Sequence, residues 1–139
     1  MPTGKDLLEM AKKLGERSEY RRGTIGGDAD GDGIPEYDCS GLVMRALWEL
    51  GYTDVPRLNS SGITKSPLFY EISPENANVG DIVVFYGKDG RPFHVGVVEW
   101  YDSSKGAGMF YGRQSSGAYS DYFGMKIPGV KSPSYFEWT

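Results

Sequence analysis

Residues 81–101 read DIVVFYGKDGRPFHVGVVEWY and contain two apolar runs, 81–86 and 93–101, on either side of the polar turn 87–90. Short runs rich in Val, Phe and Tyr that are joined by a glycine-containing turn are typical of antiparallel strands. A third run of this kind, at 108–114, follows a second turn. We therefore expect an antiparallel meander in the second half of the chain.

The first half has helical spacing. Residues 4–16 place four apolar side chains on one face, behind a capping box formed by Thr3 and Asp6, and residues 39–50 regain the same period before Gly51. The stretches 16–37 and 53–78 are expected to be loops, with a weak strand at 68–72, and the tail 125–138 is expected to add one edge strand. These patterns predict an α+β fold in which N-terminal helices pack on one face of the sheet, as a single domain over residues 1–139.

Composition excludes several classes of protein. The chain has 139 residues, 39% of them hydrophobic and 24% charged, which is typical of a soluble globular protein. It has no apolar stretch of roughly 18 residues and no apolar signal segment at its start, so we expect neither a membrane span nor a signal peptide. One cysteine and one histidine exclude an internal disulfide and a Cys/His structural zinc site.

The net charge of −4 comes mainly from one loop. Five acids lie within residues 28–38, which contain no lysine or arginine, and the rest of the chain is close to neutral. A chain of this kind lacks the basic surface that nucleic-acid binding requires. We expect no nucleic-acid partner, and the loop points instead to a bound cation.

Cys39 and His94 are the two side chains best suited to nucleophilic catalysis. Cys39 stands where the acidic loop becomes the second helix, and a helix N-terminus lowers the pKa of a thiol. The alternative is a small buried hydrophobic residue, since free cysteine is commonly buried. His94 lies on the predicted strand 93–101, where a hydrogen-bonded surface histidine is the alternative to a catalytic one.

The flanking motifs point to a family. Four segments resemble NlpC/P60 cysteine peptidases in order and spacing, and they read YDCSGLV (37–43), VPR (55–57), VGDIVVF (79–85) and HVGVV (94–98). Proteins of this family have a papain-like topology and cut peptide bonds in the stem peptides of bacterial cell walls. The resemblance implies that Cys39 is the nucleophile and His94 the general base.

Members of the family also carry a third polar residue that orients the imidazole, on the strand after the histidine strand. Alternation along 108–114 places Gln114 on the appropriate face, with an amide oxygen able to accept a hydrogen bond from an imidazole N–H. The resemblance further implies that the backbone N–H of Cys39 is an oxyanion donor. The residues that it places on the substrate side are Tyr37, Ser40, Arg57 and Asn59, although the family's Pro-Arg-x-Ser motif appears here as Pro-Arg-Leu-Asn and Arg57 is equally suited to a structural ion pair.

Residues 28–36 follow the first nine positions of an EF-hand calcium loop. Oxygen ligands are expected from the side chains of Asp28, Asp30, Asp32 and Glu36 and from the backbone carbonyl of Ile34. The twelfth position, which should be a bidentate glutamate, is Cys39. We expect a structural calcium ion and no organic cofactor, with a solvated acidic turn as the alternative.

The expected function is therefore a thiol peptidase that cleaves stem peptides of bacterial peptidoglycan as a monomer without a membrane partner. A phage endolysin or a delivered effector, released by a holin or other machinery, would fit a chain without a signal peptide. An N-acetylmuramoyl-L-alanine amidase with the same Cys/His chemistry is one alternative. A calcium-dependent, non-catalytic wall-binding module is another, and a surface patch of late aromatic residues is the third.

Overall fold

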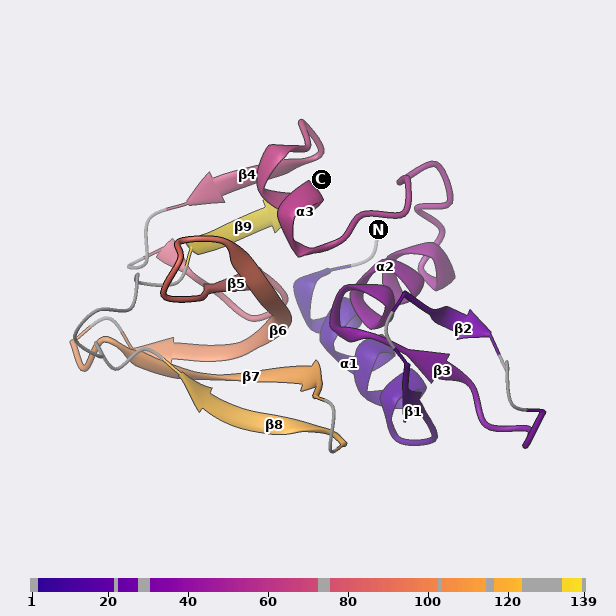
Figure 1. The fold of residues 1–139 in the computed structure, drawn as a ribbon. Helices are drawn as coiled ribbons and strands as arrows, with labels where there is room; N and C mark the ends of the chain where they lie inside the picture. Colours follow the sequence, from indigo (N-terminus) through magenta and orange to yellow (C-terminus); the bar gives the residue numbers. More distant parts are fainter. Residues whose placement is uncertain are drawn as a thin grey trace.

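The computed structural model describes residues 3–21, 23–27, 31–72, 76–102, 104–114, 117–123 and 134–138. A large curved sheet lies on one side of a pair of helices and a small sheet on the other (Figure 1). The helices are α1 (Gly4–Gly15), α2 (Cys39–Glu49) and α3 (Ser60–Lys65). The strands are β1 (Glu19–Tyr20), β2 (Ile25–Gly27), β3 (Glu36–Tyr37), β4 (Phe69–Ile72), β5 (Ile82–Tyr86), β6 (Pro92–Asp102), β7 (Ala107–Arg113), β8 (Ala118–Phe123) and β9 (Ser134–Trp138).

Both predicted helices are confirmed, and each begins at a capping residue. At α1 the Thr3 hydroxyl accepts a hydrogen bond from the Asp6 N–H, and the Asp6 carboxylate accepts one from the Thr3 N–H at 2.7 Å. At α2 the Asp38 carboxylate accepts one from the Gly41 N–H at 2.6 Å. These caps satisfy N–H groups that have no partner within the helix. The apolar face of each helix is then free to pack into the core.

The large sheet has the strand order β4-β9-β5-β6-β7-β8, and its neighbours pair antiparallel. The predicted meander is confirmed as β5, β6 and β7, and it continues into β8, which the sequence pattern did not predict. The tail was expected to form an edge strand, and this prediction is wrong because β9 lies between β4 and β5. Its pairing, Ile82 with Phe136, joins residues far apart in the chain, which a local pattern does not reveal.

The two predicted loops also contain secondary structure. Within 16–37, the strands β1, β3 and β2 form a small sheet in which Tyr20 pairs with Tyr37 in parallel register. Within 53–78, Asn59 caps α3 by accepting a hydrogen bond from the Gly62 N–H at 2.7 Å. Elements of two to six residues are too short to show a period, so their absence from the prediction has a physical reason.

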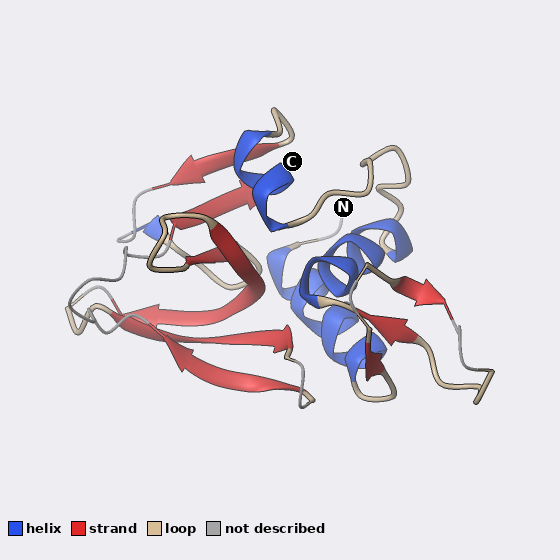
Figure 2. Cartoon of the chain, viewed as in Figure 1, coloured by secondary structure: helices blue, strands red, loops and turns tan. Residues whose placement is uncertain are grey.

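Helices α1 and α2 lie against one side of the large sheet (Figure 2), and the main core is packed between the helices and the sheet, as predicted. Helices α1 and α2 contact β6 and β7, and the main cluster includes Val95 and Val97 from β6. A second, smaller cluster is formed by Ala77, Val83, Val98 and Phe110. Successive side chains of a strand point to opposite faces, so these clusters occupy the two sides of the sheet. Within the described residues, no helix combines the length and apolar character needed to cross a bilayer.

Candidate active site

Cys39 is the first residue of α2, and its half-buried side chain packs against the main core. Backbone N–H groups of Val95, Ser40 and Cys39 itself lie where they stabilise the thiolate and lower its pKa. The sulfur therefore meets β6 at the residue that follows His94. Helix α2 and strand β6 together bring the two candidate catalytic residues to the same part of the molecule.

The net pKa shift of Cys39 is nevertheless upward. Burial raises the pKa of the thiol, the nearby Asp38 carboxylate raises it further, and the backbone N–H groups only partly offset these effects. The expectation that the helix N-terminus would lower this pKa is therefore wrong for the structure as it stands. Burial of the sulfur is the main cause, and the Asp38 carboxylate that caps α2 adds to it because it lies next to the sulfur. At neutral pH the neutral thiol is favoured.

The His94 ring lies among aromatic side chains. It stacks on Phe85 with ring centroids 5.7 Å apart and meets Phe110 edge-on at 5.8 Å. Burial lowers the pKa of His94, and the side chain of Gln114 raises it by a smaller amount. The imidazole is therefore held in its neutral form, in which one nitrogen donates a hydrogen bond and the other accepts.

Gln114 follows β7 directly and lies beside His94. Its Nε2 donates a hydrogen bond to the Tyr119 carbonyl at 3.2 Å, and its backbone N–H donates to the Gly117 carbonyl at 2.9 Å. The remaining Oε1 and the Nε2 of His94 are both buried, and neither has a well-formed hydrogen bond. If Oε1 accepts a hydrogen bond from Nε2, the neutral ring carries its proton on Nε2 and Nδ1 is the basic nitrogen.

No hydrogen bond joins the Cys39 thiol to the His94 imidazole in the described structure. Alternation along β6 explains this separation: Val95 points toward the helices and Cys39, whereas His94 and Gly96 point to the other side, and Phe110 packs there against Gly96. The sulfur meets the backbone next to His94, but the imidazole lies on the other face of the strand, so bringing Nδ1 to Sγ requires the β6 backbone at His94 to twist as well as the side chains to rotate.

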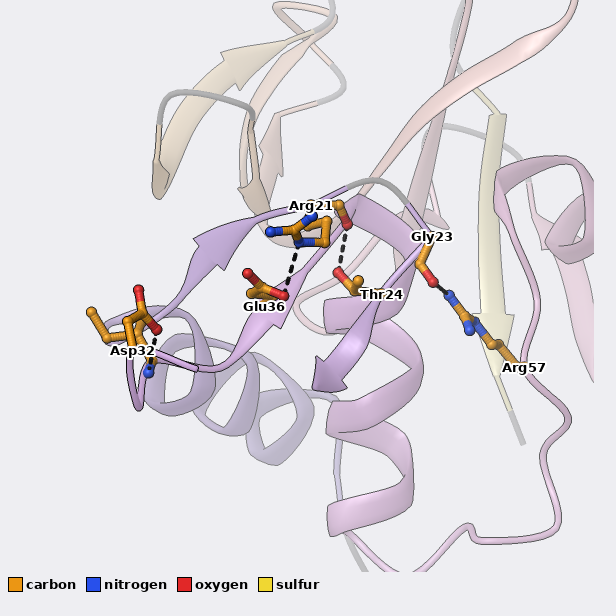
Figure 3. A network of polar contacts seen from close by, with 7 residues as sticks. Arg21, Gly23, Thr24, Asp32, Glu36 and Arg57 are labelled. Carbon is orange, nitrogen blue, oxygen red and sulfur yellow. Dashed lines mark hydrogen bonds and ion pairs between the residues drawn. The ribbon is translucent and has the colours of Figure 1, made fainter. Parts of the chain in front are cut away.

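The residues expected on the substrate side have structural contacts of their own. Tyr37 is 3% exposed and packs in the main core, and Ser40 is 6% exposed with its hydroxyl against the Asp38 carboxylate. Asn59 is exposed, and its side chain caps α3. Arg57 donates a hydrogen bond to the Gly23 carbonyl (Figure 3). The Gly23 N–H in turn donates to the Asp38 carboxylate at 2.8 Å. Arg57 thus braces the turn that holds the α2 cap.

Of the predicted calcium ligands, Asp28 and Asp30 lie outside the described residues. Asp32 is exposed and accepts a hydrogen bond from the Ile34 N–H at 2.9 Å. Glu36 is buried, and its carboxylate pairs with Arg21 at 3.0 Å (Figure 3). In the described part of the chain no three acidic, histidine or cysteine side chains are arranged to hold a metal ion. A calcium ion bound by the loop would compete with Arg21 for Glu36.

Two features near the site were not predicted from the sequence. The packing of Phe85 and Phe110 on His94 depends on the strand register, which pairs Phe85 with His94. Arg113, at the end of β7, is buried, although arginine is ordinarily exposed. The only sequence signal was its phase, since it alternates with Gln114 and so shares a face with Tyr111.

No protein-family model and no curated protein sequence matches this chain. Several solved structures are similar in fold. RipD from Mycobacterium tuberculosis, a non-catalytic NlpC/p60 domain protein adapted to peptidoglycan binding, has a TM-score of 0.61 and 16% identity over 96% of each chain. The peptidoglycan hydrolase RipB from the same species has a TM-score of 0.56 and 20% identity, over 94% of this chain and 62% of RipB.

The third structure is the P60 domain of an antigen from Mycobacterium avium paratuberculosis. It has a TM-score of 0.59 and 15% identity, over 94% of this chain and 90% of that domain. Identities this low establish a likeness of fold. The chain thus has the NlpC/P60 fold, as the Asp-Cys-Ser-Gly and His-Val-Gly motifs predicted.

Proposed function

We propose that the chain is a cysteine hydrolase that cleaves peptide bonds in peptidoglycan stem peptides, at a bond involving a D-amino acid. The observation that carries the proposal is the meeting of Cys39, at the start of α2, with the β6 backbone beside His94, while Gln114 lies against the imidazole. RipB, a peptidoglycan hydrolase, has a similar fold. The fold together with this arrangement supports hydrolysis better than either does alone.

In the proposed reaction, Nδ1 of His94 takes the proton of the Cys39 thiol as the sulfur attacks the scissile carbonyl carbon. The backbone N–H of Cys39 stabilises the oxyanion of the tetrahedral intermediate. His94 then gives the proton to the leaving amine, and a thioester remains on Cys39. Water, activated by His94, hydrolyses the thioester and regenerates the thiol, while Gln114 keeps the imidazole oriented throughout.

A non-catalytic peptidoglycan-binding domain is the second candidate. The observation that favours it is that Sγ and the imidazole share no hydrogen bond, while burial favours the neutral form of both groups. RipD, which is non-catalytic, has a similar fold. An N-acetylmuramoyl-L-alanine amidase would use the same thiol and imidazole. It would differ only in which bond of the peptidoglycan Sγ of Cys39 attacks.

Mass spectrometry of the material released from purified peptidoglycan separates these functions. A peptidase releases fragments with new amino groups inside the stem peptide, an amidase releases intact stem peptides, and a binding domain releases nothing while it sediments with the wall. Cys39→Ala should abolish release, whereas Arg91→Gln, on an exposed turn, should leave it unchanged. Release that persists in Cys39→Ala would contradict the proposed nucleophile.

We also propose that calcium binds the acidic loop 28–36. The proposal rests on the EF-hand spacing of this loop and on its position, because the loop leads through β3 to Asp38 and the start of α2. An ion bound there would order the segment that carries Cys39. The wall is the proposed place of action, with delivery by a phage or another export machinery.

A further inference from the structure

Arg113 carries a buried positive charge that the proposed reaction does not use. Its side chain is 5% exposed, and its Nε and Nη1 are buried without a hydrogen-bond partner in the described part of the chain. The ion pairs formed among the described residues do not include it. Burial lowers the pKa of Arg113, yet a guanidinium stays protonated at neutral pH. Buried N–H donors without acceptors are costly, so a group that supplies acceptors here would be bound favourably.

The strand register places Arg113 beside the candidate active site. Val97 pairs with Tyr111 in antiparallel register, and His94 and Gln114, the neighbours of Val95 and Arg113, lie against each other. Val95 and Arg113 therefore lie close together, and alternation along the strands turns both side chains to the helix-facing side of the sheet. This is the side on which Val95 meets the Cys39 sulfur.

The small sheet gives an independent indication of the same place. Glu19 of β1, the residue before Tyr20, lies close enough to Arg113 for its carboxylate to favour the charged guanidinium. Tyr20 pairs with Tyr37, which is two residues before Cys39.

We propose that Arg113 binds a free carboxylate of the peptidoglycan peptide next to the bond held at Cys39. The inference rests on the proposed peptidoglycan substrate, whose stem peptides carry carboxylates on their D-amino acids. A guanidinium is suited to this partner because it donates several hydrogen bonds in a planar arrangement that matches a carboxylate. Nη1 of Arg113 lies near Gly117, where an added Cβ would be 4.0 Å from it, so the guanidinium is close to the start of β8.

The test measures binding of two synthetic stem tetrapeptides, one with free carboxylates and one with every carboxylate amidated. The protein is the full chain carrying Cys39→Ala, so that the peptide is bound and not cleaved, and the readout is isothermal titration calorimetry. Arg113→Gln should weaken binding of the free-acid peptide about 10- to 100-fold, as expected for a charge-assisted hydrogen bond, and should change binding of the amidated peptide less than about twofold. The matched control is Arg91→Gln, which removes an 87% exposed guanidinium and should change neither affinity.

Equal losses for the two peptides, no loss for either, or a chain that binds neither peptide would each overturn the inference. If Arg113→Gln melts well below the parent because Glu19 needs its charge, Arg113→Lys replaces it. Lys keeps the charge, and it should retain a preference for the free-acid peptide that is weaker than that of the parent. This test and the test of the proposed function can fail independently. If the Cys39→Ala chain prefers the free-acid peptide but the wild type does not cleave wall material, the proposed hydrolase is contradicted and the Arg113 site is retained. If the wild type cleaves wall material but the chain shows no carboxylate preference, the Arg113 site is contradicted and the hydrolase is retained.

Discussion

The start of α2 lies very close to the turn before β2 at Gly41. Replacing this glycine tests whether that contact holds the candidate site in place. A Cβ at Gly41 would collide with the carbonyl oxygen of Thr24 and lie 2.8 Å from Oδ1 of Asp38. The Thr24 carbonyl cannot retreat freely, because it accepts the Asp38 N–H at 3.2 Å. Gly41→Ala therefore forces the turn and the helix cap apart.

The cost follows from three contributions. Overpacking at a rigid contact costs about 1–3 kcal/mol, and losing the hydrogen bond between Asp38 and Thr24 costs about 1 kcal/mol. The higher helix propensity of alanine stabilises the helix by up to about 1 kcal/mol relative to glycine. The net destabilisation is about 2 kcal/mol, which lowers the melting temperature of a domain of this size by about 6 °C.

Thermal unfolding followed by circular dichroism measures this difference, and Gly27→Ala is the matched control. Gly27 has nothing within 4 Å of an added Cβ, so alanine there should leave the melting temperature unchanged or slightly higher. If Gly41→Ala and Gly27→Ala melt within a degree of each other, the close approach of Thr24 to α2 is not as the structure has it. The rate of wall cleavage should fall in Gly41→Ala even well below its melting temperature, because the displaced cap residue Asp38 directly precedes Cys39.

Four further outcomes are expected. Alkylation of Cys39 by iodoacetamide should be slow at pH 7 and reach half its maximal rate above pH about 8.5, because burial raises the pKa of the thiol; a rate already maximal at pH 7 would contradict this. Burial lowers the pKa of His94, so the unfolded chain binds the proton at a higher pH than the folded chain does. The free energy of unfolding should therefore fall as the pH drops from about 6.5 through the folded-state pKa. Urea unfolding should show that this fall is smaller in His94→Gln than in the parent. Gly112→Ala puts a Cβ 2.8 Å from Oε1 of Gln114 and should lower kcat about tenfold with a small change in melting temperature, whereas an unchanged kcat would leave Gln114 without an orienting role. Excess chelator should lower the melting temperature by a few degrees, with recovery on adding calcium, if loop 28–36 binds the ion, and identical melting curves would exclude a structural calcium.

Local patterns predicted the parts of the fold that depend on local interactions. The capping box of Thr3 and Asp6 and the helical spacing behind it appear as α1, and the apolar runs of 81–101 appear as β5 and β6. The position of β9 was not predictable in this way, because its place depends on pairing with β4 and β5, which lie tens of residues away. The α3 helix was missed because Ile63 is its only buried residue.

The same division applies to the candidate site. Alternation along β7 placed Gln114 on the correct face, and the structure has it beside His94. The sequence did not indicate that Glu36 would turn inward to Arg21, since an acid at an EF-hand position is expected to face the loop. Nor did it indicate the burial of Arg113. Both depend on which charged groups meet after folding, and residue spacing carries no such information.

The choice between hydrolysis and binding depends on where the imidazole of His94 lies when substrate is present. Burial opposes charge on both groups, so forming the thiolate–imidazolium pair costs free energy that the amides at the start of α2 and the carbonyl oxygen of Gln114 must offset. The attraction between the two charges adds to this offset only if Nδ1 reaches Sγ. Opposite charges at hydrogen-bond distance stabilise each other, whereas separated charges in a buried site do not. In the structure, Phe85 and Phe110 pack on the ring on the side of β6 that faces away from Cys39. A hydrolase must therefore release the ring from this packing as the peptide enters, whereas a binding domain has no reason to move it.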